Sequence, residues 1–321
     1  MTTLITHLLY FQSRSFTQIL RGLRLHYALM SSTLICIGFF LNYLEGFDWG
    51  FLVLFLSFFC ANLFGFVVND FYDAASDNHE LRKRTRNLFC SPHTKRLALG
   101  VLYASLSLSI VLSGIISLSM LLIVILFNTL AYVYSAPPIQ LRNRLYWDWG
   151  FVFLWKGLLI FAGQYYISGM TILHDPFSIG AVAMILMLSL IAQMTNQMRD
   201  FNIDKLTNTN NSSQCLGLQA TSTLRRLLLI LFFSFSIVFC GFFRLHITML
   251  LILLNLSLYY LIQPAKYNNI LEFANVWIIS VFLEYFTAYF GNQQHIIAIG
   301  VILIIGSTIW YGKRISLFKW H

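Results

Sequence analysis

Long apolar runs constrain this chain more than any other feature of its sequence. A helix needs about 20 mainly apolar residues to cross a bilayer, and ten segments approach that length. They cover residues 27–44, 50–69, 97–115, 117–134, 149–169, 177–197, 224–243, 246–263, 272–290 and 295–312. The run at 272–290 is the weakest, because it contains Glu272, Asn275 and Glu284. The pattern predicts an all-α polytopic membrane protein.

Composition supports a lipid environment and argues against several soluble classes. Charged residues make up 10% of the 321 residues, whereas soluble domains carry about 25%. The net charge of +9 could indicate nucleic-acid binding in a soluble protein. Here the basic residues lie between apolar runs, so we expect the lipid bilayer and no nucleic acid as partner. The five cysteines are scattered without a CxxC pair, which argues against a disulfide framework or a zinc site.

The basic residues also predict the orientation of the chain. With the N-terminus in the cytoplasm, all 21 Lys and Arg residues except Arg244 and Lys156 fall on the cytoplasmic side or in segments leading to it. This asymmetry favours an even number of helices and a multi-pass protein of the bacterial inner membrane. We expect residues 1–25 to form an interfacial segment and residues 26–321 to form one transmembrane domain.

Two polar motifs follow the second and sixth apolar runs. Both read N-x3-D-x3-D, and both are predicted to lie on the cytoplasmic side. The first contains Asn69, Asp73 and Asp77, with Asp70 beside them, and the second contains Asn196, Asp200 and Asp204. Such an internal repeat often marks a site at the interface between the repeats of a membrane protein.

The motifs have the chemistry of a magnesium–diphosphate site. Residues at i, i+4 and i+8 share one face of a helix, so each motif should form a polar stripe. Carboxylates aligned in this way repel one another, and a divalent cation offsets that cost. Mg²⁺ prefers oxygen ligands and usually binds one or two carboxylates together with substrate phosphates. We therefore predict that each of the two stripes can hold one Mg²⁺ ion and that the two ions share a diphosphate between them.

Several cations accompany the motifs as candidate phosphate ligands. They are Lys83 and Arg84 in the run Arg82–Arg86, Arg199 and Lys205 at the second motif, and Lys156 inside the fifth run. Each has a simpler explanation as well. Membrane topology alone accounts for the basic run, and Lys156 could extend its ammonium to the interface. Acidic residues at a helix end can also cap the helix or face solvent.

These residues resemble the UbiA-type family of intramembrane prenyltransferases. That family has N-D-x2-D-x3-D after its second helix and D-x3-D after its sixth, matched here by the two motifs. It often has Lys-Arg-Thr after the first motif and Tyr-Ser/Thr-x-Pro-Pro at the end of helix four. The matching segments are Lys83-Arg84-Thr85 and Tyr134-Ser135-Ala136-Pro137-Pro138, with Arg142 shortly after them. The resemblance covers residues from about 20 to 310.

The resemblance implies a single bundle of nine or ten transmembrane helices around a central cavity. The activity it implies is transfer of a prenyl group from a prenyl diphosphate to a lipophilic, usually aromatic, acceptor such as a quinone precursor. By the same resemblance, Mg²⁺ would be held by Asp70, Asp73, Asp77, Asp200 and Asp204, and the last four of these would be the catalytic carboxylates. The substrate-binding residues would be Asn69, Lys83, Arg84, Tyr134, Lys156, Asn196, Arg199 and Lys205.

The chain departs from the family pattern at two places. Asn87 stands where many members have the proline of Arg-Pro-Leu. Asn208, Thr209 and Asn211 stand where many have the Gly, Lys and Thr of Gly-Lys-x-Thr. These departures keep two other classes open, namely a cation-coupled transporter or lipid-binding membrane protein, and a catalytically inactive relative.

Overall fold

Helices account for the fold of the part of the chain that the computed structural model describes, which is residues 22–40, 49–169, 176–207 and 209–245. The long elements are α2 (Leu25–Phe40), α3 (Trp49–Asp77), α5 (Pro92–Ile116), α6 (Leu118–Ser135), α7 (Trp147–Ser168), α8 (Pro176–Leu206) and α10 (Leu218–Phe242). Short elements connect them: α4 (Leu81–Arg86), η1 (Leu88–Cys90), η2 (Leu141–Asn143) and α9 (Ser212–Leu216). No strand occurs in these ranges.

Six of the described helices are long and apolar enough to cross a membrane: α3, α5, α6, α7, α8 and α10. A shorter apolar helix, α2, matches the first predicted run. Seven of the ten predicted runs are thus helices in the structure. The runs at 246–263, 272–290 and 295–312 lie outside the described residues, so a total of nine or ten helices stays a prediction.

Both Asp motifs continue the helix that precedes them. The apolar run 50–69 extends as α3 to Asp77, and the run 177–197 extends as α8 to Leu206. Helices of 29 and 31 residues measure about 44 and 47 Å at 1.5 Å per residue, against roughly 30 Å of hydrocarbon. The excess length allows the polar last turns of each helix to reach beyond the apolar layer.

The chain forms two compact units. Unit 1 consists of residues 1–172 and 202–215, and unit 2 consists of residues 173–201 and 216–321. The described part of unit 1 contains α2 to α7 and the segment that follows the second motif. The described part of unit 2 contains α8 up to Phe201, and α10.

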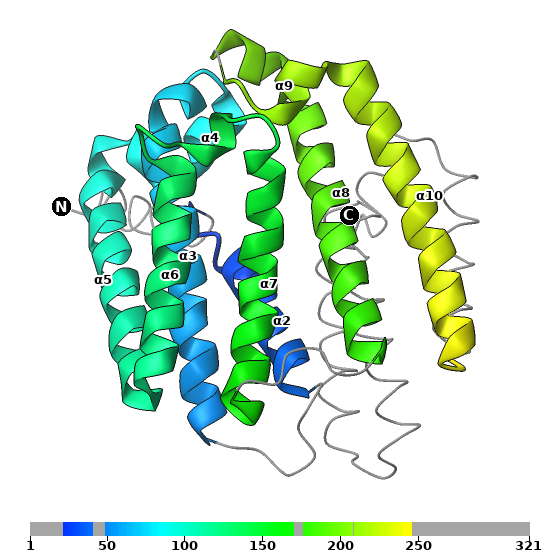
Figure 1. The fold of residues 1–321 in the computed structure, drawn as a ribbon. Coiled ribbons are helices and arrows are strands. Elements are labelled where there is room, and N and C mark those ends of the chain that lie inside the picture. Colours follow the sequence, from blue (N-terminus) through cyan, green and yellow to red (C-terminus); the bar gives the residue numbers. More distant parts are fainter. Residues whose placement is uncertain (1–21, 41–48, 170–175, 208, 246–321) are drawn as a thin grey trace, which may run out of the picture. The chain divides into compact units, whose positions relative to one another are not determined.

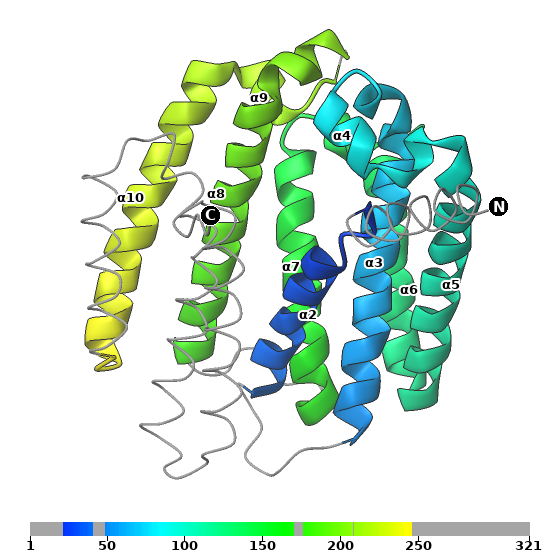
Figure 2. The ribbon, with the colours of Figure 1, turned by 180° about the vertical axis from the view of Figure 1, so that it is seen from behind.

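In unit 1, α3 packs against α2, α5 and α6, and α2 also packs against α7 (Figures 1 and 2). Small residues bring the backbones of α2 and α7 into contact. A Cβ atom on Gly38 would lie 2.0 Å from the carbonyl oxygen of Ile160, and one on Gly163 would lie 2.2 Å from that of Ile35. Close approach of this kind is a usual way to join helices in a membrane, where apolar side chains gain little from leaving lipid.

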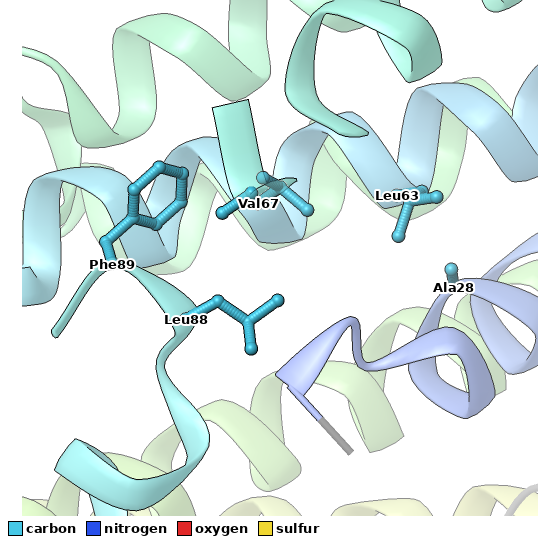
Figure 3. Close-up of a cluster of buried hydrophobic side chains, with 6 residues drawn as sticks. Ala28, Leu63, Val67, Leu88 and Phe89 are labelled. Carbon is cyan, nitrogen blue, oxygen red and sulfur yellow. The ribbon is translucent and has the colours of Figure 1, made fainter. Parts of the chain in front are cut away.

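A hydrophobic cluster attaches the loop after the first motif to the helices of unit 1. Leu88 and Phe89 of η1 meet Leu63 and Val67 of α3 and Ala28 of α2 (Figure 3). The exposed fraction of each of these side chains is below one tenth. The cluster therefore fixes the backbone on the C-terminal side of Asn87, a residue that contacts the first motif.

In unit 2, α8 and α10 meet through aromatic and small residues. The rings of Phe177 and Phe239 have centroids 5.3 Å apart, and a Cβ atom on Gly180 would lie 2.3 Å from the ring of Phe239. Ser236 of α10 donates to the sulfur of Met184 at 3.4 Å. The contact fixes the two helices against each other along their length.

Candidate active site

The last turns of α3 present the first motif on two faces. Successive residues of an α-helix are about 100° apart. Asp70 and Asp77, seven residues apart, therefore point within about 20° of each other, whereas Asn69 and Asp73 are separated by about 40°. The expected single stripe is thus divided, because eight residues from Asn69 to Asp77 accumulate a drift of about 80°.

The Asp70 face is buried, and its carboxylates are accompanied by an equal number of guanidiniums. Asp70 forms an ion pair with Arg24, which precedes α2, and both Asp70 and Asp77 are buried. Asn87 donates from Nδ2 to the Asp70 carbonyl at 2.7 Å and to Asp77 Oδ2 at 2.9 Å. Burial lowers the pKa of Arg86, and repulsion from Arg24 lowers it further, whereas the two carboxylates oppose the shift. Two guanidiniums thus accompany two carboxylates.

The Asp73 face lies toward the loop between α6 and α7. Asn69 donates from Nδ2 to Asp73 Oδ2 at 2.8 Å, and its own Oδ1 accepts from Ser135 Oγ at 3.2 Å. The guanidinium of Arg142, in η2, forms an ion pair with Asp73. The carboxylate is therefore held by one amide and one cation.

Arg142 also connects the first motif to the end of the second. Burial lowers the pKa of Arg142 to about 10, and the carboxylate of Asp204 acts in the opposite direction, which places that carboxylate within electrostatic range. Arg142, Asp73 and Asp204 all belong to unit 1. The guanidinium of Arg142 is therefore paired with Asp73 of the first motif and lies within electrostatic range of Asp204 of the second.

Asp148 attaches the segment after α8 to unit 1. Its side chain is fully buried, and it accepts from Ser212 N at 2.9 Å and from Ser212 Oγ. The Ser212 hydroxyl in turn accepts from Tyr146 N at 2.7 Å. These bonds fix the position of the chain that carries Asp204.

Each motif ends in an aspartate that accepts a hydrogen bond from an asparagine in the following loop. Asn87 donates to Asp77 Oδ2 at 2.9 Å, and Asn211 donates to Asp204 Oδ2 at 2.8 Å. Asn87 also accepts from Phe89 N, and Asn211 from Gln214 N, so both amides are oriented by the backbone. The two asparagines stand where the sequence departs from the pattern that it resembles.

The predicted phosphate ligands of unit 1 have varied surroundings. Lys83 pairs with Glu80 at 3.5 Å, whereas Arg84 and Lys205 are exposed. Lys156 donates to Ser31 Oγ at 3.0 Å, inside the contact between α7 and α2. Tyr134 stacks on Phe151, with ring centroids 4.1 Å apart. None of these contacts reaches Asp73, and the roles of these residues as substrate ligands stay predictions.

In unit 2, Asn196 is exposed and Arg199 Nε donates to Asp200 Oδ1 at 3.1 Å. Asp200 lies one helical turn before Asp204 in α8, as the spacing predicts. Its role as a metal ligand stays a prediction.

The oxygen donors of the site fit Mg²⁺ in kind. Within the described ranges no group of three or more His, Cys, Asp or Glu side chains is gathered closely enough to hold a metal by itself. Mg²⁺ needs no such group, because it usually keeps one or two carboxylates and takes its remaining ligands from phosphate and water. Asp73 and Asp204, joined through Arg142, provide one carboxylate from each motif.

The sequence alone does not identify three residues that organise the site. They are Arg24, Asp148 and Arg142, the last of which is the ion-pair partner of Asp73. In the sequence, Arg142 stands out only as a neighbour of the Pro-Pro segment, because its partner Asp73 lies 69 residues away in the chain. Asn87 stands out only as a replacement for proline, and its hydrogen bonds to the first motif become evident in the structure.

Comparisons with known proteins identify the family of this chain and solved structures of similar fold. The sequence model of the UbiA prenyltransferase family matches residues 29–279, although no curated protein matches the chain significantly. A UbiA homolog from Archaeoglobus fulgidus bound to GPP and Mg²⁺ is 18% identical over 93% of this chain and 99% of its own, with a TM-score of 0.59. A UbiA homolog from Aeropyrum pernix K1 is 13% identical over 89% and 98%, with a TM-score of 0.57.

A third similar structure is a digeranylgeranylglyceryl phosphate synthase, which is 16% identical over 86% of this chain and 98% of its own, with a TM-score of 0.55. These likenesses agree with the described helices in fold. The family match spans most of the sequence and includes both Asp motifs. The chain belongs to the UbiA prenyltransferase family, as its motifs predict, and is a prenyltransferase of the multi-pass membrane type.

Proposed function

We propose that this chain is an Mg²⁺-dependent enzyme that transfers a prenyl group from a prenyl diphosphate to a lipophilic acceptor within the membrane. One observation carries the proposal. The Arg142 guanidinium pairs with Asp73 of the first motif and lies within electrostatic range of Asp204 of the second. Together these three groups carry one net negative charge. The two carboxylates can bind Mg²⁺, and the guanidinium can bind phosphate oxygens.

Asp73 and Asp204 are the proposed principal metal ligands, with Asp77 and Asp200 as further candidates. When bound, Mg²⁺ would neutralise the charge that develops on the departing diphosphate. The Archaeoglobus homolog, whose structure contains GPP and Mg²⁺, supports a site for Mg²⁺ and a prenyl diphosphate in this chain. Asp70 is assigned a structural role instead, because its carboxylate pairs with Arg24 in the interior.

The chain's own residues would bind and orient the substrate. Arg142 would neutralise diphosphate oxygens, assisted by Lys83, Arg84 and Lys205 from the adjoining segments. Asn69 and Asn211 would hold the carboxylates in place through the hydrogen bonds described above. The C–O bond of the prenyl diphosphate breaks with its electron pair on diphosphate, the acceptor supplies the pair for the new bond to carbon, and the acceptor then loses a proton.

The acceptor is proposed to be aromatic, for instance a quinone precursor. Tyr134, stacked on Phe151, is an aromatic surface of the type that shields an allylic cation. The proposed setting is a single domain over residues 26–321, in a bacterial inner membrane, with the site and the N-terminus facing the cytoplasm. The distribution of Lys and Arg supports that orientation.

The test is diphosphate release by the purified protein, supplied with geranyl diphosphate, Mg²⁺ and a panel of phenols. Asp73→Asn and Asp204→Asn should each lower the rate by at least roughly 100-fold, because metal stabilisation of the leaving group contributes several kcal/mol. Asn78→Ala, at an exposed position next to the motif, is the matched control.

Release that persists at the control rate in both Asp variants would refute the proposed roles. Magnesium-dependent solute flux in proteoliposomes without any diphosphate release would indicate a transporter. Failure of the folded protein to bind geranyl diphosphate would indicate an inactive relative.

A further inference from the structure

A polar cavity lies in unit 2, between the last turns of α8 and the first turns of α10. Its volume is about 770 Å³, within the range of small-molecule sites. Arg199, Arg225 and Arg226 line it together with the hydroxyls of Thr195, Ser222 and Thr223. Among the residues that the structure describes, no carboxylate lines it.

Helix geometry explains how the cations converge there. Ser222, Arg225 and Arg226 are spaced i, i+3 and i+4, and so lie on one side of α10. Thr195 and Arg199 are one turn apart on α8. The two helices therefore contribute guanidiniums from opposite walls of one cavity.

Arg225 is built into the cavity and is not simply a surface charge. It is buried, with an exposed fraction of 5%, and its Nη1 donates to Thr195 Oγ1 at 3.5 Å. Membrane topology explains why basic residues occur at such a helix end, but it leaves them free to extend into water. Arg225 therefore lies in the wall of the cavity, where its guanidinium can donate to a bound anion.

This cavity faces away from the Asp stripe of α8. Asn196 and Asp200 are each one residue beyond Thr195 and Arg199, so they point about 100° around the helix from the cavity lining. Asp200 pairs with Arg199 and offsets one of the three positive charges. A net positive charge remains among these four groups.

The chemistry of the lining selects a phosphate-bearing ligand. Guanidinium groups bind phosphate oxygens through two parallel hydrogen bonds, and the hydroxyls add neutral donors. One turn after Arg226 on the same side of α10 lies Ile230, which is 61% exposed. An apolar tail attached to the phosphate would meet this surface, as basic pockets between membrane helices do with lipid head groups.

We propose that this cavity binds a phosphate-bearing anion on the side of α8 that carries Thr195 and Arg199, about 100° around the helix from Asn196 and Asp200. The shared chemistry is a phosphate group, which an anionic lipid or a free phosphate ion can supply. Occupancy would bring the ends of α8 and α10 together through Arg199, Arg225 and Arg226.

Two probes distinguish the sources. In one arm, native mass spectrometry follows dioleoyl phosphatidylglycerol added to the delipidated full chain, with dioleoyl phosphatidylcholine as the neutral comparison. In the other arm, the melting temperature is measured in inorganic phosphate against chloride of equal ionic strength. Binding in the first arm alone identifies a lipid head group, and binding in the second arm alone identifies free phosphate.

Arg226→Gln and Arg225→Gln should each weaken the affinity for the probe that binds by roughly tenfold, since each removes a charge-assisted hydrogen bond. Arg225→Lys should retain more binding than Arg225→Gln. Arg96→Gln, at an exposed position of α5, removes the same charge elsewhere and should leave binding unchanged. Arg226 is exposed, so we expect the Arg226→Gln variant to fold. The proposal would be overturned if neither probe bound, or if Arg226→Gln and Arg96→Gln weakened binding equally.

Discussion

Asp70 and Asp73 lie three residues apart in α3 and have opposite surroundings. On the Asp70 face, Arg24 and Arg86 accompany the two carboxylates of Asp70 and Asp77, and the group is buried. On the Asp73 face, Arg142 pairs with Asp73 and lies within electrostatic range of Asp204. In the first arrangement each carboxylate is balanced by a guanidinium, which indicates a structural role. In the second, one cation lies near a carboxylate of each motif, which indicates a role in the reaction.

The largest expected effect is on catalysis, when a residue of the Asp73 face is replaced. Arg142→Gln should lower kcat/KM for geranyl diphosphate by roughly 100-fold or more, because it removes the cation proposed to bind the diphosphate. Its melting temperature should change less than that of Arg24→Gln. A normal kcat/KM in Arg142→Gln would show that the shared contact has no part in the reaction.

The Asp70 face should respond in stability instead. Arg24→Gln leaves a buried carboxylate without its ion pair, which costs about 3–5 kcal/mol in comparable cases. We expect a melting temperature clearly below that of the unmodified protein, measured in the same detergent. The rate per folded molecule should stay within about tenfold, and a stable but inactive Arg24→Gln would reverse the assignment of the two faces.

The loop asparagines should have intermediate effects. Asn211→Ala removes the amide that holds Asp204, and loss of such support for a metal ligand typically costs 10–100-fold in metal affinity. The Mg²⁺ concentration that gives half-maximal diphosphate release should therefore rise.

Asn87→Ala supplies the matched case for the other motif. It removes hydrogen bonds both to Asp77 and to the Asp70 backbone, so stability should fall as well as Mg²⁺ affinity. Identical effects of the two substitutions on melting temperature would contradict the difference between the faces.

The smallest expected effect concerns pH. The pKa of Arg142 is lowered to about 10, so this cation keeps its proton at lower pH and loses it only as the pH rises through that value. The KM for geranyl diphosphate should therefore show no titration from Arg142 between pH 6.5 and 8.5, within roughly twofold. A rise of KM across that range that is absent from Arg142→Lys would contradict the account.

Much of the architecture could be predicted from local sequence. The apolar runs predicted the described helices, since lipid requires each crossing segment to satisfy its own backbone hydrogen bonds. Their ends were less predictable: α3 and α8 extend through the motifs to Asp77 and Leu206, because polar residues continue a helix readily once it leaves the hydrocarbon.

The candidate site was predictable in its carboxylates and not in their partners. The spacing of Asn69 and Asp73 predicts their contact, which is local to one helix turn. The pairings of Asp73 with Arg142 and of Asp148 with Ser212 depend on how separate segments pack, across 69 and 64 residues. The division between Asp70 and Asp73 likewise depends on which segment covers each face of α3.

The most direct test of this division is the Mg²⁺ dependence of diphosphate release by Asp73→Asn and Asp70→Asn, measured side by side and expressed per folded molecule. We predict that Asp73→Asn loses roughly 100-fold in rate at any Mg²⁺ concentration, or requires far more Mg²⁺, whereas Asp70→Asn retains the normal half-maximal Mg²⁺ concentration. A normal Mg²⁺ response in Asp73→Asn together with its loss in Asp70→Asn would contradict the account.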